Sequence, residues 1–540
     1  MLTPRPEYPR PLLVRPDWKN LNGSWCFFED AGDVGLIEGW FKAGLPKGAG
    51  TIQVPFPVES EASTIHNIQP ASVVWYQRDF DLPLAWDKRV CLRFGACDHW
   101  TRVFVNGQEV GQHRGGYAPF AFDIDHVVGP GANTIVVRVE DSLSWTQPRG
   151  KQAGTTRWPI DYDSVTGIWQ TVWLESLPPV SIESTLSVFG VDSGELVLTA
   201  LFSKQVEGEL TVELLLAGVL VDRKQVNTGL RSEARVSFQL DEPLLWSPDS
   251  PILYDVKLTL LDIRTGSVDE ATSYIGLREV EVRDGFLLLN GEKLFLRGIL
   301  DQGYFPGGWY TALSDADLRR DVELTLQMGF NCARKHQKAE DPRYLYWADK
   351  LGLLVWAEMP SGKIFSTELV QTLVSEWTDL VKRDRAHPCV IAWVPFNESW
   401  GVWHQSSRPQ QRAFVDGVVG ITRAMDASRP VVGNDGWEFS SGDLWTLHLY
   451  FEGKSLNQRL NELIKSPQSS VAEGNGMGSR VGALPGANVE GLPILLTECG
   501  GVGYGRFSES DFSYGDLPET EVLLQEAIQE IAKMIRAAPK

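Results

Sequence analysis

Short runs in which apolar and polar residues alternate recur through the first 178 residues of the chain. Such alternation is typical of β-strands with one buried face. The dipeptide Asn106-Gly107, which follows one of these runs, predicts a tight hairpin turn. We therefore expect a β-sandwich closed by a strand over Gly167–Glu175. The clearest of the alternating runs are Val73–Phe80, Arg89–Phe94, Thr101–Val105 and Thr134–Val139.

A second series of evenly spaced strands is predicted between residues 179 and 277. Strand-like runs occur at Leu196–Phe202, Glu209–Leu214 and Ala234–Leu240, and Trp246–Tyr254 supplies a proline-rich turn and a further strand. Roughly 100 residues with about seven strands are typical of an immunoglobulin-like sandwich.

From about residue 278 the strands alternate with helical patterns, which indicates βα units around a parallel sheet. One predicted helix begins after Ser314, a good N-cap residue; others cover Pro342–Lys350, Thr367–Arg385 and residues 519–537. The predicted barrel strands are Lys293–Ile299, Phe330–His336, Leu353–Met359, Val390–Phe396, Val431–Asn434, Trp445–Tyr450 and Ile494–Thr497.

These are seven strands, whereas a (β/α)8 barrel has eight. The sequence ends at residue 540, 42 residues after Glu498, and this tail is occupied by one loop and one helix. Strand number, tilt and shear must agree for a barrel to close. We therefore expect a TIM-type barrel without its last strand, and two alternatives stay open: an open barrel or a shortened product.

Two of the buried strands stop abruptly on a glutamate. The runs Val390–Trp400 and Pro493–Gly501 contain Glu398 and Glu498 where each strand meets solvent, at the carboxyl end where α/β folds place their chemistry. Taken alone, either glutamate is typical of a solvated surface residue or of a residue that caps a helix. Together, among nearby aromatic residues, they predict a pocket with two carboxylates, which are the equipment for cleaving a glycosidic bond.

Composition narrows the possible partners and the compartment. A formal charge of −20 disfavours nucleic acid and anionic membranes, which bind clustered Lys and Arg. The first residues lack the apolar core of a secretory signal, and no apolar run reaches the roughly 18 residues of a membrane span. Six scattered cysteines without a CxxC pair indicate free thiols in a reducing compartment, so we expect a cytoplasmic protein. Cys499 lies beside Glu498 but has no histidine close in sequence, which disfavours a cysteine nucleophile.

Motifs from all three regions, in the right order, resemble glycoside hydrolase family 2, the β-galactosidase and β-glucuronidase family. The resemblance implies a multidomain fold of β and α/β parts: a jelly-roll sugar-binding-type domain over residues 1–178, an immunoglobulin-like β-sandwich over 179–277 and a TIM-barrel catalytic domain over 278–540. The motifs are Val54–Ser60, Phe94–Ala96, Val105–Gly107, Gly115–Phe120, Gly167–Trp173, Gly329–His336 and Asp384–Glu398.

The resemblance also implies a retaining mechanism and an exo-acting enzyme most like a β-galactosidase. In that mechanism Glu398 is the acid/base, Glu498 is the nucleophile, and Asn397 hydrogen-bonds the sugar 2-hydroxyl. A retaining pair needs a separation of about 5–5.5 Å. Asn397 could instead cap the following turn.

Further residues at strand ends are candidates for binding the substrate or shaping the pocket. Resemblance places Tyr450 near the nucleophile, where its phenol can orient the carboxylate. Packing is the alternative role for Trp356 and Glu358, and a structural role is the alternative for His387. The candidate substrate-binding residues are Asn397, Arg334, His336, His387, His448, Tyr450, Asp301 and Trp356.

Other family 2 specificities and a loss of activity remain as alternatives. Glucuronidases of the family carry an Asn-x-Lys pair after the nucleophile, and none follows Glu498 here, which disfavours that specificity. A degenerate carbohydrate-binding protein is the second alternative. No compact group of metal ligands is evident in the sequence, so we expect no metal and no cofactor. The expected partner is a β-glycoside substrate. A homo-oligomer is possible, because large sandwiches often supply dimer faces.

Overall fold

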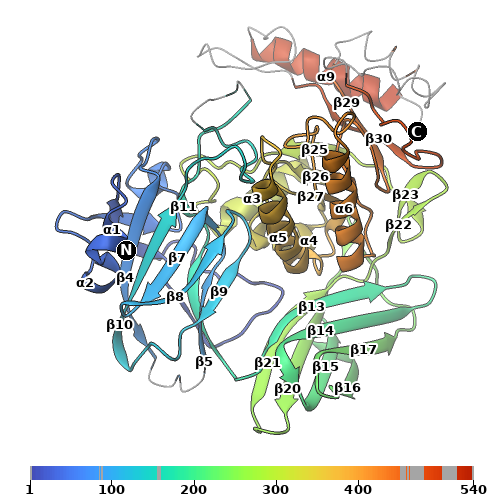
Figure 1. Ribbon diagram of the computed structural model, residues 1–540. Helices are drawn as coiled ribbons and strands as arrows, with labels where there is room; N and C mark the ends of the chain where they lie inside the picture. The colour runs from blue at the N-terminus through green and yellow to red at the C-terminus, as the bar shows by residue number, and fades with distance from the viewer. Residues whose placement is uncertain are drawn as a thin grey trace.

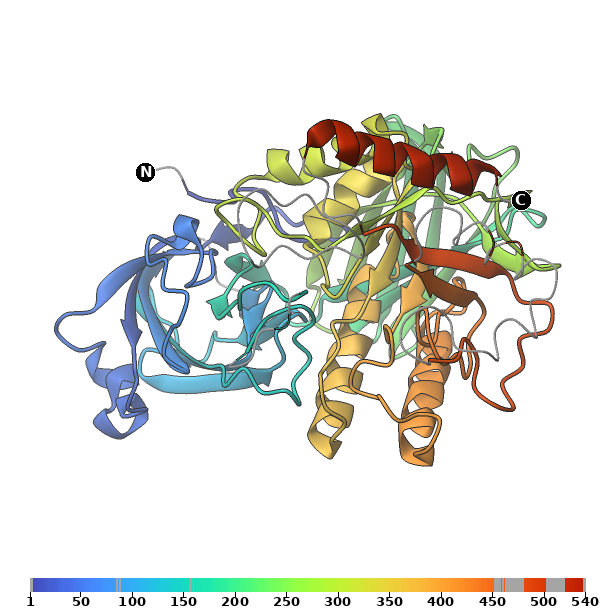
Figure 2. The ribbon, with the colours of Figure 1, turned by 90° about the horizontal axis from the view of Figure 1, so that it is seen from above.

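The structure, a computed structural model, describes residues 3–83, 86, 89–154, 158, 160–450, 458, 461, 480–501 and 520–537. Two β-sandwiches lie against a third part that contains parallel strands and the longer helices (Figure 1). Seen from above, the blue first sandwich stays to one side of these helices (Figure 2). None of the helices in these ranges combines the length and apolar composition needed to cross a bilayer.

The first sandwich consists of two antiparallel sheets that enclose an aromatic and aliphatic core. The Asn106-Gly107 turn joins β7 to β8 as predicted, and both residues have positive φ, as a tight hairpin requires. The predicted closing strand is interrupted, because only Gly167–Ile168 and Val172–Leu177 pair with other strands. In spatial order the sheets are β1 (Trp18–Asn20), β12 (Val172–Leu177), β5 (Arg89–Phe94) and β9 (Phe120–Asp123); then β3 (Gly50–Val54), β2 (Gly23–Glu29), β4 (Val73–Leu82), β10 (Gly131–Glu140), β7 (Trp100–Val105) and β8 (Gln108–Arg114).

Short elements complete this part of the chain. They are the helices α1 (Gly35–Glu38) and α2 (Trp40–Ala43), the 3₁₀ turn η1 (Glu61–Ser63), and the strand pair β6 (Cys97–Asp98) and β11 (Gly167–Ile168).

The second sandwich has seven main strands in two antiparallel sheets, as the sequence pattern predicted. Alternate residues of these strands are buried and meet in one aliphatic core. The sheets are β13 (Ile182–Phe189), β14 (Glu195–Val206) and β17 (Arg231–Gln239); then β16 (Val219–Asn227), β15 (Gly208–Leu216), β20 (Tyr254–Asp262) and β21 (Val268–Ile275), beside the small pair β18 (Trp246–Ser247) and β19 (Ser250–Pro251).

A small antiparallel sheet precedes the barrel strands. It consists of β22 (Val280–Arg283), β23 (Phe286–Leu289) and β24 (Glu292–Lys293). The prediction of a first barrel strand at Lys293–Ile299 was wrong in its placement. The turn at Asn290-Gly291, where both residues have positive φ, directs Lys293 back into this small sheet. The first parallel strand is instead β25 (Gly298–Asp301).

The parallel sheet runs β25, β26 (Cys332–Lys335), β27 (Leu354–Glu358) and β28 (Val390–Val394), with β29 (Trp445–Leu449) and β30 (Ile494–Cys499) as a second parallel pair. The predicted strand Val431–Asn434 contributes a single bridge, from Trp393 to Val431, and a second bridge, from Asn397 to Asp435, follows directly after it. The helices that the structure describes in this part are α3 (Asp315–Gln327), α4 (Pro342–Leu351), α5 (Thr367–Asp384), α6 (Pro409–Met425) and α9 (Glu521–Ala537).

Capping by serine explains the starts of α3 and α5. The Ser314 side chain accepts a hydrogen bond from the Asp317 backbone, and Ser366 does the same for Leu369, so both helices begin where the sequence predicted. Residues 502–519, where an eighth strand would be sought, lie outside the described ranges.

Candidate active site

The carboxyl ends of β28, β29 and β30 bring the two predicted catalytic glutamates together. Glu398 follows β28, and Glu498 lies in β30, where the parallel register pairs it with His448 of β29. One oxygen of each carboxylate and one ring nitrogen of His448 all lie within 4.8 Å of one another. Both glutamates are largely buried, with 9% and 7% of their surface exposed. Two strand ends that are 100 residues apart in sequence therefore form one acidic cluster.

Glu498 is surrounded by groups that stabilise its ionised form. Arg334 Nη1 donates to Glu498 Oε1 across 2.7 Å, and the Tyr450 hydroxyl donates to Oε2. His448 Nδ1 lies 3.5 Å from the same Oε2. Burial alone would raise the pKa of Glu498, but the charges of His448 and Arg334 lower that pKa to about 2. Glu498 is thus a carboxylate over the whole neutral and mildly acidic range.

Glu398 has a different set of contacts. Its Oε1 lies 2.7 Å from His448 Nδ1, and its backbone N–H donates to the Asp435 carbonyl. Glu398 and Ser399 both have φ in the left-handed region, at 51° and 58°. Ser399 is held in this turn because its N–H donates to the Asn434 side chain. The strained turn directs the Glu398 carboxylate toward the cluster.

His448 connects the two glutamates to a buried aspartate. Its Nδ1 faces Glu398 and its Nε2 lies 3.2 Å from Asp435 Oδ2. Burial lowers the pKa of His448, but the charges of Glu498 and Asp435 outweigh it and raise that pKa to about 10. A protonated ring donates on both sides, which matches the acceptor oxygens of Glu398 and Asp435.

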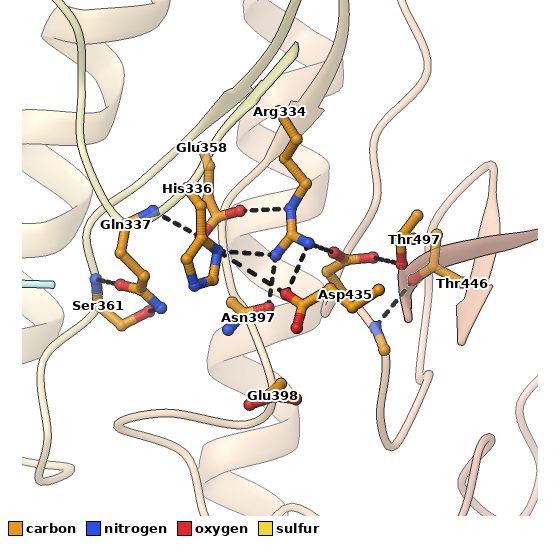
Figure 3. A network of polar contacts seen from close by, with 12 residues as sticks. Arg334, His336, Gln337, Glu358, Ser361, Asn397, Glu398, Asp435, Thr446 and Thr497 are labelled. Carbon is orange, nitrogen blue, oxygen red and sulfur yellow. Dashed lines mark hydrogen bonds and ion pairs between the residues drawn. The ribbon is translucent and has the colours of Figure 1, made fainter. Parts of the chain in front are cut away.

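Arg334, at the end of β26, is the centre of a fork of hydrogen bonds (Figure 3). Its Nε donates to Glu358 across 2.8 Å, Nη1 contacts Asp435 at 2.8 Å as well as Glu498, and Nη2 donates to Asn397 Oδ1 across 2.7 Å. A planar guanidinium suits this geometry because its five donors are fixed relative to one another. Since Asn397 accepts through its oxygen, its NH₂ group is the part that can donate to a sugar hydroxyl.

Two other predicted residues lie beside this network. His336 Nδ1 lies 3.1 Å from Glu358 Oε1 and 3.0 Å from Arg334 Nη2. Trp356 pairs with Arg334 in the sheet register and is buried in the barrel core, and its indole N–H has no hydrogen-bond partner among the described residues. Glu358 therefore orients Arg334, whereas Trp356 is part of the barrel core beside it.

The structure does not bring Asp301 and His387 to the cluster. Asp301 pairs in register with Lys335 and forms a 2.7 Å ion pair with it, on the sheet face opposite to Arg334. His387 precedes β28, at the other end of that strand from Glu398, where its Nδ1 lies 2.5 Å from Asp349 Oδ2. The structural role that was the alternative for His387 thus fits its surroundings.

Several residues at the site were missed from the sequence. Asp435 follows directly on the predicted strand Val431–Asn434, so its place at a strand end was a usable signal. Lys151 and Asp161 belong to a loop of the first sandwich, and no local pattern connects them with the barrel. Lys363 forms a 3.0 Å ion pair with Asp161 and so joins this loop to the barrel.

Two groups of side chains in the described part of the chain place potential metal-binding atoms within 4.8 Å of one another: Glu398, His448 and Glu498, and Asp349, His387 and Cys389. In both groups these atoms are already engaged in hydrogen bonds, His448 with Glu398 and His387 with Asp349. That the protein needs no metal stays a prediction.

Comparison with known proteins agrees with this architecture. Three family models match the chain in succession: "Glycosyl hydrolases family 2, sugar binding domain" over residues 18–178, "Glycosyl hydrolases family 2" over 192–278, and "Glycosyl hydrolases family 2, TIM barrel domain" over 280–471. The chain belongs to glycoside hydrolase family 2. The predicted combination of two sandwiches and a TIM-type barrel is thereby confirmed.

Relatives of this family 2 protein carry two kinds of name. The chain is 30% identical to a β-galactosidase of Thermoanaerobacter pseudethanolicus over 67% of its own length and 48% of the relative's, so it spans about half of that protein. It is 28% identical to a β-glucuronidase of Paenibacillus borealis, covering 78% of this chain and 74% of the relative. The crystal structure of Ruminococcus gnavus β-glucuronidase shares the fold, with a TM-score of 0.78 at 22% identity, covering 99% of this chain and 92% of the other.

Proposed function

We propose that the protein is an exo-acting retaining β-glycosidase in which Glu498 is the nucleophile and Glu398 the acid/base. The observation that carries the proposal is the proximity of the two carboxylates, which offer oxygens within 4.8 Å of each other. Retaining enzymes hold their two carboxyl groups about 5–5.5 Å apart, whereas inverting enzymes need about 6.5–9.5 Å to admit a water molecule. The spacing thus favours double displacement.

The different surroundings of the two glutamates support their different roles. Glu498 is ionised and held by Arg334 and Tyr450, so it can attack the anomeric carbon while Glu398 donates a proton to the leaving oxygen. The glycosyl bond then removes the negative charge of Glu498. This loss favours the ionised form of Glu398, which can take a proton from the water that releases the sugar.

Residues next to the two glutamates bind the sugar and take no part in bond cleavage. The Asn397 NH₂ group donates to no other residue in the described ranges and is positioned to donate to the 2-hydroxyl, a contact that strengthens in the transition state. The loop of the first sandwich packs on the barrel mouth, where the Lys363 and Ile364 N–H groups donate to the Trp145 carbonyl. The loop covers one side of the site, and a site covered on one side suits an enzyme that binds the end of a glycan chain.

The names of the relatives guide the choice of sugar. The sequence led us to expect a β-galactoside, and one reported relative is a β-galactosidase. The other relative and the solved structure are β-glucuronidases, which favours a β-glucuronide as the first substrate to test.

The roles can be separated by chemical rescue. With an aryl β-glycoside, Glu498→Ala should lower kcat by at least about 10⁴-fold, as loss of a nucleophile does in other covalent mechanisms. Added azide should restore part of the rate and form an α-glycosyl azide, with inverted configuration. Glu398→Ala with azide should instead form the β-glycosyl azide, because azide attacks the covalent intermediate.

The exposed Glu490, just before β30, provides a matched control, and Glu490→Ala should behave as the parent. A Glu498→Ala variant as active as the parent would refute the assignment. A parent protein that binds glycosides in calorimetry without releasing aglycone would favour the carbohydrate-binding alternative.

A further inference from the structure

A lysine from the first sandwich is largely buried at the barrel mouth, and no described residue serves as its counter-ion. Lys151 is only 9% exposed, yet its ammonium group forms no hydrogen bond or ion pair within the described ranges. It lies 5.3 Å from the ring centre of Trp400, two residues after Glu398. A buried cation is unfavourable unless an anion or hydrogen-bond acceptors compensate it.

The segment around Lys151 is fixed to the barrel rather than hanging free. The N–H groups of Arg149 and Gly150 donate to the Ser361 carbonyl, across 3.1 and 3.0 Å. Gly150 has φ of 58°, and a Cβ there would lie 2.1 Å from the Gln337 carbonyl oxygen, so only glycine permits this approach. Gln337 and Ser361 are hydrogen-bonded to each other (Figure 3).

This anchoring connects Lys151 to the catalytic network. The Gln337 N–H donates to Glu358 Oε1, and the other oxygen of Glu358 holds Arg334. The position of Lys151 is therefore set by the same strand ends that set the site. Burial lowers the pKa of Lys151, whereas the charges of Glu498 and Glu398 oppose this effect, which places its ammonium within their electrostatic reach.

A neighbouring lysine, Lys363, has the carboxylate partner that Lys151 lacks among the described residues. Lys363 Nζ lies 3.8 Å from the ring centre of Trp400 and 4.1 Å from that of Trp158, and it pairs with Asp161. Both lysines flank Trp400, but only Lys363 has a carboxylate at bonding distance. Among the described residues, no acceptor is bonded to the charge of Lys151.

We infer that Lys151 binds the carboxylate of a uronic acid sugar in the catalytic site, and so selects β-glucuronides over neutral β-glycosides. This inference rests on the proposed function. A carboxylate on the bound sugar would supply the charge-assisted hydrogen bond that Lys151 lacks. The chain has no Asn-x-Lys pair after Glu498, and here the cation comes from another domain.

An alternative role for Lys151 is to offset the negative charge of the two glutamates. That role would affect every substrate alike. Recognition of a carboxylate affects only substrates that carry one, so the two roles differ in the ratio of rates for a matched pair of substrates.

The pair is 4-nitrophenyl β-D-glucuronide and 4-nitrophenyl β-D-glucoside, which differ only at C6. Lys151→Met should lower the ratio of kcat/KM for the glucuronide to kcat/KM for the glucoside by about 100-fold, in the range for loss of a charge-assisted contact. Lys151→Arg, which keeps the charge, should retain most of the ratio. Lys257→Met, at an exposed lysine of β20, is the control and should leave the ratio unchanged.

Calorimetry with D-glucuronic acid and D-glucose tests the same point without turnover. The parent should bind the acid more tightly, and Lys151→Met should lose this preference. Equal losses for both substrates, or an unchanged preference, would overturn the inference. A parent that cleaves the glucoside faster than the glucuronide would also overturn it while leaving the glycosidase proposal intact.

Two further results would show whether the glycosidase proposal or the assignment of a carboxylate ligand is the part that fails. Cleavage of no β-glycoside, together with Lys151-dependent binding of D-glucuronic acid, would refute the proposed function and keep the carboxylate site. Faster cleavage of 4-nitrophenyl β-D-glucoside 6-sulfate than of the glucuronide would overturn the assignment of a carboxylate in favour of a sulfate ester.

Discussion

Arg334 Nη1 and Glu498 Oε1 lie 2.7 Å apart and join the carboxyl ends of β26 and β30. Burial disfavours the charge of Arg334, but its contacts with Asp435, Glu358 and Glu498 raise its pKa well above the usual value. Arg334 thus both holds the carboxylate of the proposed nucleophile in place and keeps it ionised.

Arg334→Lys should therefore lower kcat/KM by about 100-fold or more. A lysine keeps one positive charge but cannot donate to Glu358, Glu498 and Asn397 at the same time. The measurement is steady-state kinetics on the best aryl β-glycoside, with the melting temperature of each variant as a check on folding. Full activity in a folded Arg334→Lys variant would show that the several hydrogen bonds of Arg334 are not needed to position Glu498.

The Tyr450 hydroxyl donates to Glu498 Oε2, the oxygen not held by Arg334. Tyr450→Phe should lower kcat by about 10- to 100-fold, because a hydrogen bond to a charged group contributes about 1.5–3 kcal/mol. The effect should fall mainly on kcat, since the phenol positions the carboxylate rather than the sugar. A change confined to KM would indicate that Tyr450 contacts substrate instead.

The sequence located the two glutamates because each ends an apolar run, and strand ends in α/β folds converge. It located the start of α3 because Ser314 is a strong N-cap residue, and it placed the next helix at Thr367–Arg385, where the structure shows Ser366 as the N-cap of α5. It misplaced the first parallel strand because the Asn290-Gly291 turn had not been recognised. Lys151 could not be predicted, because its place depends on how one domain docks on another.

Glu376 of α5 is inserted into the first sandwich, where its Oε1 accepts hydrogen bonds from the Tyr117 and Ala118 N–H groups. Burial raises the pKa of Glu376 from 4.5 to about 7. The folded protein therefore holds its proton more tightly than the unfolded chain does. The stability that this proton contributes is complete below pH 4.5 and is lost as the pH rises through 7.

Glu376→Gln should remove this dependence, because the amide stays neutral and keeps an oxygen acceptor. At pH 8 the variant should be more stable than the parent by about 1–3 kcal/mol, and at pH 4.5 the difference should vanish. Denaturant unfolding at both pH values measures this. A variant that is less stable than the parent at pH 8 would show that the ionised carboxylate is favourable at this interface.

The approach of Gly150 to the Gln337 carbonyl can be tested with a matched pair of glycines. Gly150 and Gly218 both have positive φ, at 58° and 80°, but a Cβ at Gly218 would meet no atom within 4 Å. Gly218→Ala should lower the free energy of unfolding by about 1 kcal/mol, the effect of backbone conformation alone. Gly150→Ala adds a clash at 2.1 Å, so it should destabilise by about 2–4 kcal/mol.

Gly150→Ala should also displace Lys151 and so weaken the preference for a sugar with a carboxylate at C6. Gly150→Ala is therefore expected to lower the ratio of glucuronide to glucoside kcat/KM, whereas Gly218→Ala should leave it at the parent value. Because Gly218 lies in a turn of the second sandwich, the comparison separates a general loss of stability from a local loss of docking. Equal effects of the two substitutions on this ratio would mean that the loop does not fix the specificity of the site.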